Sequence, residues 1–194
     1  MRLLILVLLL LSPGPAMGQI SEEADQGTGH TLELFDFTPS EPDSWRIVND
    51  GVMGGRSKGY VSIDYGVLTF SGVLVTRGGG FTSVRTPAAL NLEGFDGIEL
   101  LVRGSGRKFE LEVSDGERFR GRTVSRRAPF PTSADWEWVR VPFDALQSSI
   151  FGNRVRTAPL DPVRVGALGI FLADAIDGEF ELQIGQMRAY RDQG

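Results

Sequence analysis

Hydrophobic and polar residues alternate along several short segments that are separated by glycine-containing turns. The clearest case is residues 108–113, where Phe109, Leu111 and Val113 share one face and charged side chains share the other. Residues 136–141 and 179–184 alternate in the same way. Because successive side chains of a strand point to opposite faces, this period predicts strands that are buried on one side.

The same pattern predicts further strands along the chain. Residues 60–63 and 67–70 flank a tight turn at 64–66, and residues 97–103 and 165–172 are largely apolar. Only residues 142–149 could hold a helical turn, and the 25 glycines and 10 prolines fit frequent turns. Many short strands of this kind predict one all-β domain, an antiparallel β-sandwich or barrel. A sandwich is favoured because each of its sheets buries one face.

The first residues predict a targeting segment. A positive start, an apolar run from Leu3 to Leu11 and the small residues Ala16-Met17-Gly18 indicate a secretory signal peptide over residues 1–18. The run is too short to span a bilayer, although an uncleaved anchor remains the alternative. We expect a flexible lead-in over residues 19–30, one domain over residues 31–192 and a periplasmic or secreted protein without stable membrane insertion after cleavage.

Composition removes several classes of function. The chain has no cysteine and one histidine, His30 in the predicted lead-in, which excludes Ser-His-Asp, Cys-His and multi-histidine zinc sites. The net charge of −5 disfavours nonspecific nucleic-acid binding. We predict no catalytic residue, metal or cofactor. Two alternatives stay open: a structural calcium near a loop, and a glycosidase that uses two carboxylates. The candidate acids are Asp50, Asp96, Asp115 and Asp174.

Two glycine-rich stretches carry the candidate site. Residues 45–57 place Trp, Asn, Asp and Met among glycines, and residues 77–85 place two arginines around Gly78-Gly79-Gly80. Each stretch either closes the fold or presents a site, and the three glycines could form a backbone nest for an anion. The predicted ligand- or partner-binding residues are Trp45, Asn49, Asp50, Met53, Arg77, Phe81, Arg85, Arg103 and Arg107. Trp136 and Trp138 share one strand face and are further candidates for ligand contact.

The two stretches also carry a resemblance. The runs Asn49-Asp50-Gly51-Val52-Met53-Gly54-Gly55 and Gly79-Gly80-Phe81-Thr82-Ser83-Val84-Arg85, with residues 95–98, 104–107 and 138–143, resemble the complex I intermediate-associated protein 30 family from about Leu34 to Tyr190. The resemblance implies a galactose-binding-like jelly roll. It also implies a chaperone-like, non-enzymatic role, because the family's best-known members are mitochondrial assembly factors for respiratory complex I. The family usually has Gly-Asp-Gly-Arg where this chain has Gly104-Ser105-Gly106-Arg107.

Three functions follow from these observations. The leading hypothesis is a non-enzymatic exported module that binds a protein partner or a glycan at a loop rim. The alternatives are an assembly factor or chaperone for a membrane complex and a carbohydrate-active enzyme. A buried pair of Asp50 with Arg85 would indicate a scaffold, whereas an open cleft that holds both would indicate a site.

Overall fold

The computed structural model describes residues 30–38 and 44–192, with the side chains of Val52 and Met53 excepted. The predicted signal peptide and residues 19–29 lie outside the described residues, and they stay predictions. The domain's first strand begins at His30, one residue before the predicted boundary, because His30 pairs with Arg191 near the C-terminus.

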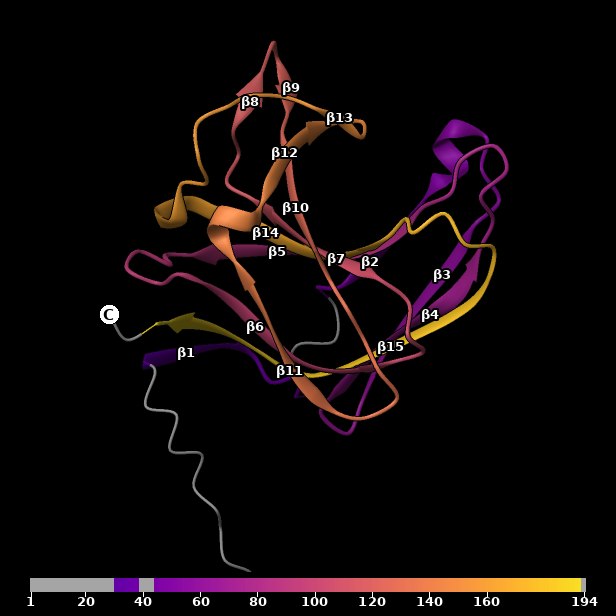
Figure 1. Ribbon diagram of the computed structural model, residues 1–194, viewed down its shortest axis with the longest axis horizontal. Helices are drawn as coiled ribbons and strands as arrows, with labels where there is room; N and C mark the ends of the chain where they lie inside the picture. The colour runs from indigo at the N-terminus through magenta and orange to yellow at the C-terminus, as the bar shows by residue number, and fades with distance from the viewer. Residues whose placement is uncertain (1–29, 39–43, 193–194) are drawn as a thin grey trace, which may run out of the picture.

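The described residues form two packed antiparallel sheets (Figure 1). The six-stranded sheet has the order β11-β6-β15-β4-β3, and β1 also pairs with β15. Its strands are β1 (His30–Phe35), β3 (Lys58–Asp64), β4 (Val67–Leu74), β6 (Gly97–Gly104), β11 (Glu137–Pro142) and β15 (Gly178–Arg191).

The seven-stranded sheet has the order β13-β12-β10-β7-β14-β5-β2. Its strands are β2 (Arg46–Asn49), β5 (Thr82–Leu90), β7 (Phe109–Ser114), β10 (Ser125–Phe130), β12 (Gln147–Ile150), β13 (Asn153–Arg154) and β14 (Val165–Leu172). A small hairpin of β8 (Arg118–Phe119) and β9 (Arg122–Thr123) rises beside β12 and β13 on the side of this sheet that faces away from the other sheet (Figure 1). Three short 3-10 helices complete the described elements: η1 (Asp50–Met53), η2 (Phe143–Ala145) and η3 (Pro162–Arg164).

The core lies between the two sheets and follows the alternation of the sequence. Phe109, Leu111 and Val113 of β7 are fully buried, as the pattern predicts. Along β15 the inward positions change phase after Ile184, because a bulge at Gly185 turns Met187 into the core. The predicted all-β antiparallel sandwich is therefore present, and the predicted helical turn within 142–149 corresponds to η2.

The local pattern of the sequence does not predict strands whose pairing depends on distant segments. The stretch 45–57 is expected as a loop, but its first part is β2, which pairs with β5, and its middle is η1. β10 contains Pro129 and two arginines, yet it lies between β7 and β12. Cross-strand pairing outweighs the weak local preference in these segments.

Candidate functional site

Asp50 joins the two glycine-rich stretches. Its buried carboxylate accepts hydrogen bonds from the Ser57 amide at 3.0 Å and the Ser57 hydroxyl at 2.7 Å. The Gly80 amide donates at 2.7 Å and the Phe81 amide at 3.3 Å. We call this set of contacts the Asp50 clasp. Burial alone would raise the pKa of the Asp50 carboxyl, but the hydrogen bonds from Gly80, Ser57 and Phe81 outweigh it and hold the pKa below its usual value.

The glycines of both stretches leave room for this carboxylate. A Cβ at Gly55 would stand 2.1 Å from the Asp50 carboxyl carbon, and one at Gly79 would stand 2.5 Å from an Asp50 oxygen. Both distances are far inside van der Waals contact, so any side chain at either position would displace the carboxylate. The glycine-rich character of the two stretches therefore has a packing cause at these positions.

Asn49 and Trp45, two other predicted residues of the first stretch, also make intramolecular contacts. Asn49 Oδ1 accepts hydrogen bonds from the Gly59 amide at 3.0 Å and the Thr82 hydroxyl at 2.6 Å, which ties β2 to β3 and β5. Trp45 is 5% exposed and packs edge-on against Phe35 with ring centres 5.3 Å apart. The side chain of Met53 lies outside the described residues.

The predicted arginines do not gather in one place. Arg107 donates to both oxygens of Asp174 at 2.6 and 2.7 Å and to the carbonyls of Ile176 and Glu179. Its guanidinium therefore makes intramolecular hydrogen bonds that stabilise the fold. Arg103 lies on the outward face of the six-stranded sheet, where it stacks over Trp136 at 5.0 Å. Arg77 is exposed in the turn after β4.

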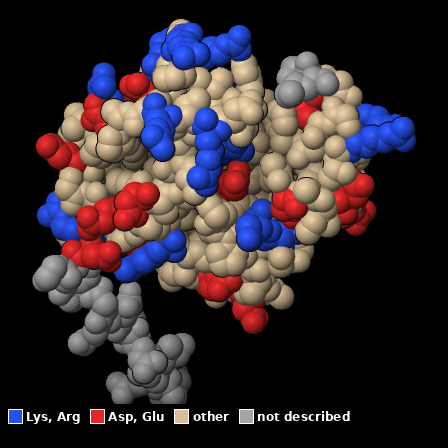
Figure 2. All heavy atoms as spheres, turned by 45° about the horizontal axis from the view of Figure 1, so that its top comes forward, with Lys and Arg blue, Asp and Glu red and all other residues tan. Residues whose placement is uncertain are grey.

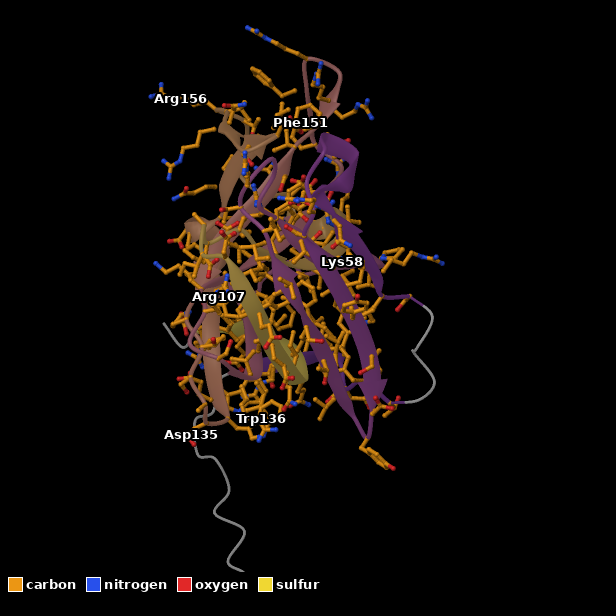
Figure 3. The ribbon with its side chains drawn as sticks, turned by 90° about the vertical axis from the view of Figure 1, so that its right-hand side faces the viewer. Lys58, Arg107, Asp135, Trp136, Phe151 and Arg156 are labelled. Atoms are coloured by element: carbon orange, nitrogen blue, oxygen red, sulfur yellow. The ribbon has the colours of Figure 1, made fainter. Side chains whose placement is uncertain are left out.

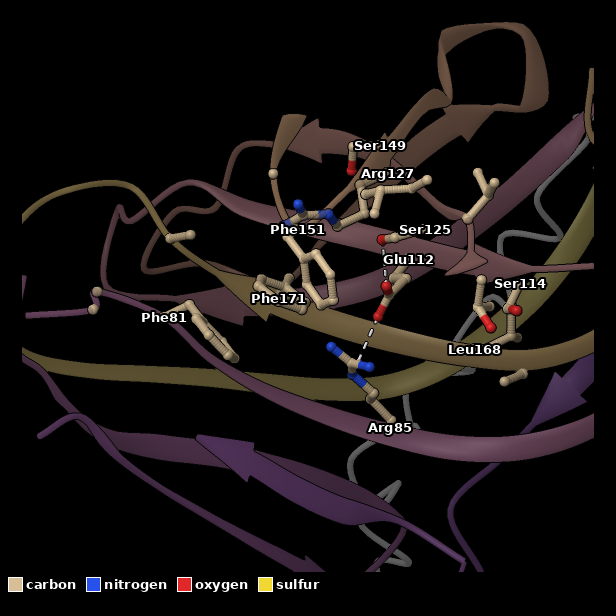
Figure 4. Close-up of a pocket in the computed structure, with 18 residues that line it drawn as sticks. Phe81, Arg85, Glu112, Ser114, Ser125, Arg127, Ser149, Phe151, Leu168 and Phe171 are labelled. Atoms are coloured by element: carbon tan, nitrogen blue, oxygen red, sulfur yellow. Dashed lines mark hydrogen bonds and ion pairs between the residues drawn. The ribbon is translucent and has the colours of Figure 1, made fainter. Parts of the chain in front are cut away.

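Arg85 and Phe81 instead line a cleft of about 600 Å³ on the outward face of the seven-stranded sheet (Figure 4). Its walls come from β5, β7, β9, β10, β12 and β14 together with the turns after β4, β12 and β14. The lining includes three phenylalanines, Phe81, Phe151 and Phe171. Asp50 and Arg85 do not pair with each other: Asp50 is enclosed by the two stretches, and Arg85 faces the cleft.

A row of polar side chains crosses the floor of the cleft (Figure 4). Arg85 Nε lies 3.2 Å from a carboxylate oxygen of Glu112, and the Ser125 hydroxyl donates to the other oxygen. Arg85 and Glu112 lie on strands that flank β14, and Gly169 of β14 stands between them in register. A Cβ at Gly169 would come within 3.0 Å of the Arg85 side chain. The missing side chain at Gly169 thus permits the ion pair across β14.

The aromatic part of the cleft centres on Phe171. Its ring stacks with Phe81 at 5.2 Å, and the guanidinium groups of Arg127 and Arg85 lie 4.3 and 5.1 Å from its centre. Arg127 is also paired with Glu110 at 2.9 Å. The cleft therefore offers apolar rings beside arginines that are already held in place, which suits contacts with both apolar and carboxylate groups of a ligand.

The acids considered for catalysis are engaged elsewhere in the fold. Asp115 is buried against Arg126, with Nη2 to Oδ2 at 2.9 Å, and Asp174 is held by Arg107. Burial alone would raise the pKa of each of these carboxyls. Hydrogen bonds from the Asp161 amide and Arg126 to Asp115, and from Arg107 to Asp174, outweigh burial and hold both pKa values below their usual value. Asp96 accepts from the Asp192 amide. Glu112 is the one carboxylate that lines the cleft among the described residues.

The sequence did not predict four residues that line the cleft: Glu112, Phe171, Arg127 and Phe151. Their strands were partly predicted, but their outward positions become neighbours only through the order of strands in the sheet. The alternation of β7 does carry one usable signal, because it places Glu112 on the face opposite the core.

Within residues 30–38 and 44–192, no group of three or more His, Cys, Asp or Glu side chains stands close enough to hold a metal ion. None of the helices in this part of the chain has the length and apolar character needed to cross a membrane.

Two curated proteins that are similar to this chain are named for complex I. A "Probable complex I intermediate-associated protein 30, mitochondrial" of Caenorhabditis briggsae is 25% identical over 187 residues, which cover 81% of this chain and 54% of that protein. The mouse "Complex I intermediate-associated protein 30, mitochondrial" is 25% identical over 174 residues, covering 77% and 53%. The chain spans about half the length of the curated relatives it matches.

Among solved structures, a family 11 carbohydrate-binding module from Clostridium thermocellum, in complex with a β-1,3-1,4-mixed-linked tetrasaccharide, superposes with a TM-score of 0.63 at 12% identity. The match covers 84% of this chain and 96% of the module. This likeness concerns the fold, and the predicted antiparallel β-sandwich of jelly-roll type is confirmed.

The comparisons correct one expectation and decide the family. The expected periplasmic or secreted location is wrong, because the curated relatives are mitochondrial proteins. The model of the complex I intermediate-associated protein 30 family matches residues 35–184, which include both glycine-rich stretches and every strand of the cleft. The chain therefore belongs to the complex I intermediate-associated protein 30 family.

Proposed function

We propose that this protein is a non-catalytic binding module that holds a polypeptide segment of a partner in the cleft of the seven-stranded sheet. The observation that carries the proposal is the lining of that cleft, in which three phenylalanines lie beside the Arg85–Glu112 pair. Within the proposal Arg85 and Phe81 contact the partner. Asn49, Asp50 and Arg107 hold the loops that surround it.

The chemistry of the cleft favours a polypeptide. Apolar side chains of a bound segment would pack against Phe81 and Phe171, and their burial would supply most of the affinity. The Glu112 side chain is 11% exposed, and its carboxylate, held by Arg85 and Ser125, is oriented to accept a backbone or side-chain hydrogen bond. Such a pre-ordered polar group orients a ligand without losing side-chain entropy on binding.

The relatives suggest what the partner belongs to. Proteins named for association with complex I intermediates match over most of this chain. We therefore propose that the bound segment is part of a subunit or another assembly protein of a respiratory membrane complex of that type. The module would release the segment when the complex is completed.

Site-specific photo-cross-linking tests this proposal. A photo-reactive phenylalanine replaces Ser114, which lines the cleft, and in a control protein it replaces Ser62, which is exposed on β3 of the other sheet. Each protein is produced in cells that lack the native gene, and products are identified after irradiation. We expect protein adducts from the cleft position and few from the control. Equal labelling from both positions, together with normal assembly of respiratory complexes on native gels in the deletion strain, would overturn the proposal.

A glycan ligand is the second candidate. It is favoured by the polar row of Arg85, Glu112 and Ser125, because sugars need several hydrogen-bond partners, and by the shared fold with a carbohydrate-binding module. A glycan panel measured with the wild-type protein and with Glu112→Gln tests it. Saturable binding that this change weakens would support the glycan, and the absence of binding across the panel would remove it.

A further inference from the structure

The end of the molecule beside the cleft is strongly basic, although the whole chain is acidic. Residues 118–134 and 145–160 contain no aspartate or glutamate, whereas the chain has 25 acidic and 20 basic residues in total. The two hairpins in these segments, β8–β9 and β12–β13, rise next to each other over the same side of the seven-stranded sheet (Figure 1). We call the exposed arginines of this end the arginine rim: Arg118, Arg120, Arg122, Arg154 and Arg156.

The arginine rim contacts uncharged groups. Arg118 donates to the carbonyl of Gly121, Arg154 to the side-chain amide oxygen of Gln147, and Arg120 and Arg122 stack over phenylalanine rings. Among the described residues none of the rim arginines forms an ion pair, in contrast to Arg85 and Arg127 in the cleft. Figure 2, which turns this side of the molecule toward the viewer, shows several basic side chains standing close together on the upper part of the face.

The hairpin tips expose large side chains at positions that normally favour small ones. Phe151 and Gly152 have φ of 48° and 79°, and Arg120 and Gly121 have φ of 50° and 79°. Two successive residues with positive φ make a type I′ turn, in which the first position usually holds Asn, Asp or Gly. Phe151 nevertheless occupies this position with 74% of its surface exposed, and Figure 3 shows it toward the same end of the molecule as Arg156. Tyr65 shares this geometry and exposure at the β3–β4 turn, so Phe151 is distinguished by its place in the lining of the cleft.

Phe151 also connects the rim to the cleft. It lines the cleft together with Gly152 and Ser149, and the Arg122 guanidinium lies 5.1 Å from its ring centre. A segment that leaves the cleft past Phe151 would therefore pass the arginine rim. Opposite charge on that segment would be steered toward the rim, and the attraction would be screened by salt.

We propose that the partner segment is acidic: its apolar residues enter the cleft beside Phe171, and its carboxylates meet the arginine rim beyond Phe151. This inference rests on the proposed function and specifies the class of partner. An extended acidic polypeptide fits both features, whereas a flat anionic membrane would touch only the hairpin tips and leave the cleft empty.

Two synthetic peptides test the proposal with the full-length protein. Each has about ten residues, which span roughly 33 Å when extended. The first alternates Glu with Leu, and the second alternates Gln with Leu. We expect the Glu peptide to bind more tightly by about tenfold, as several exposed ion pairs would give. Its advantage should shrink as salt is raised from about 0.05 to 0.5 M.

Two sets of substitutions locate the binding. The triple variant Arg118→Gln, Arg120→Gln and Arg122→Gln should lose the preference for the Glu peptide and keep the weaker binding of the Gln peptide. A matched triple variant, Lys58→Gln, Arg103→Gln and Lys108→Gln, removes the same charge from exposed positions elsewhere and should keep the preference. Thermal unfolding at the wild-type temperature confirms that each protein is folded.

The outcomes separate this inference from the proposed function. Equal binding of both peptides, or an equal effect of the two triple variants, overturns the acidic partner while cleft cross-links from Ser114 still support a polypeptide. Unchanged peptide binding after Phe171→Ala would overturn the assignment of the cleft as the binding site, and the proposed function would fail with it. Rim-dependent binding to vesicles of phosphatidylcholine with phosphatidylserine, without binding of the Glu peptide, replaces the acidic segment by a membrane surface.

Discussion

Asp50→Asn tests the Asp50 clasp with the smallest change of shape. The side chain keeps its size, loses its charge and replaces one acceptor oxygen with a donor. Asp50 is 0% exposed, and its oxygens accept from the amides of Ser57, Gly80 and Phe81 and from the Ser57 hydroxyl. We expect the variant to fold and to be clearly less stable than the wild type.

The size of the effect follows from these contacts. The carbonyl oxygen of the Asn would take the place of Oδ2, which has three of the donors, so the Ser57 amide would face an NH2 group. An unsatisfied buried amide costs about 1–3 kcal/mol, and each remaining bond loses about 1 kcal/mol when its acceptor loses the charge. The lower desolvation cost of a neutral amide offsets part of this sum. The net loss in the free energy of unfolding is about 2–4 kcal/mol.

Urea unfolding followed by tryptophan fluorescence measures this loss. The midpoint should fall with little change in the slope, since the native fold is retained. Asp135→Asn is the matched control, because Asp135 is exposed and the charge change is identical; its effect should stay within about 0.5 kcal/mol. A loss of less than about 1 kcal/mol for Asp50→Asn, or equal losses for both variants, would refute the argument that the carboxylate holds the two stretches together.

Three more predictions concern the glycine packing at Asp50, the Arg107–Asp174 pair and stability in acid. Gly55→Ala should cost about 2 kcal/mol or more in urea unfolding, since its Cβ would overlap Asp50, whereas Gly51→Ala, with nothing within 4 Å, should be nearly neutral; similar effects would contradict the packing argument. Arg107→Ala should cost about 3 kcal/mol, because Asp174 is left buried without its partner, and adding Asp174→Asn should recover part of that loss; additive losses would argue against the pair. The pKa values of Asp50 and Asp174 are lowered on folding, so both carboxylates stabilise the fold fully above the unfolded pKa of about 3.9, and this stabilisation should be lost as the pH falls below it. The free energy of unfolding, measured as a function of pH, should therefore fall less steeply in acid for Asp50→Asn than for the wild type. Identical pH profiles for the two proteins would exclude this linkage.

The fold was largely readable from the sequence because its evidence is local. Each sheet buries one face, so β7 and β15 show their burial as an alternation of single residues. β5 was less visible, since Arg85 and Pro87 interrupt its apolar pattern and its neighbours β14 and β2 supply the pairing. Local pattern predicts a strand well where one face is apolar, and less well where the register of distant strands decides.

The cleft could be predicted only in part for the same reason. Phe81 and Arg85 belong to the second glycine-rich stretch, residues 77–85, which the sequence predicts as part of a candidate site. Glu112 and Phe171 lie on β7 and β14, and nothing in the order of residues states that these strands lie beside β5. The contact between Arg85 and Glu112 further depends on Gly169, whose relevance appears only when the three strands are aligned.

The Asp50 clasp and the cleft share Gly80 and Phe81, and Phe81 connects them through both its backbone and its ring. The Phe81 amide donates to Asp50 at 3.3 Å, and the Phe81 ring stacks on Phe171 at 5.2 Å. A carboxylate that fixes the backbone at Phe81 therefore also fixes one wall of the cleft, although it need not contact a ligand. Loss of binding in an Asp50 variant would then not identify Asp50 as a binding residue. The distinction requires Phe171→Ala, which alters the cleft and leaves every contact of the Asp50 clasp in place.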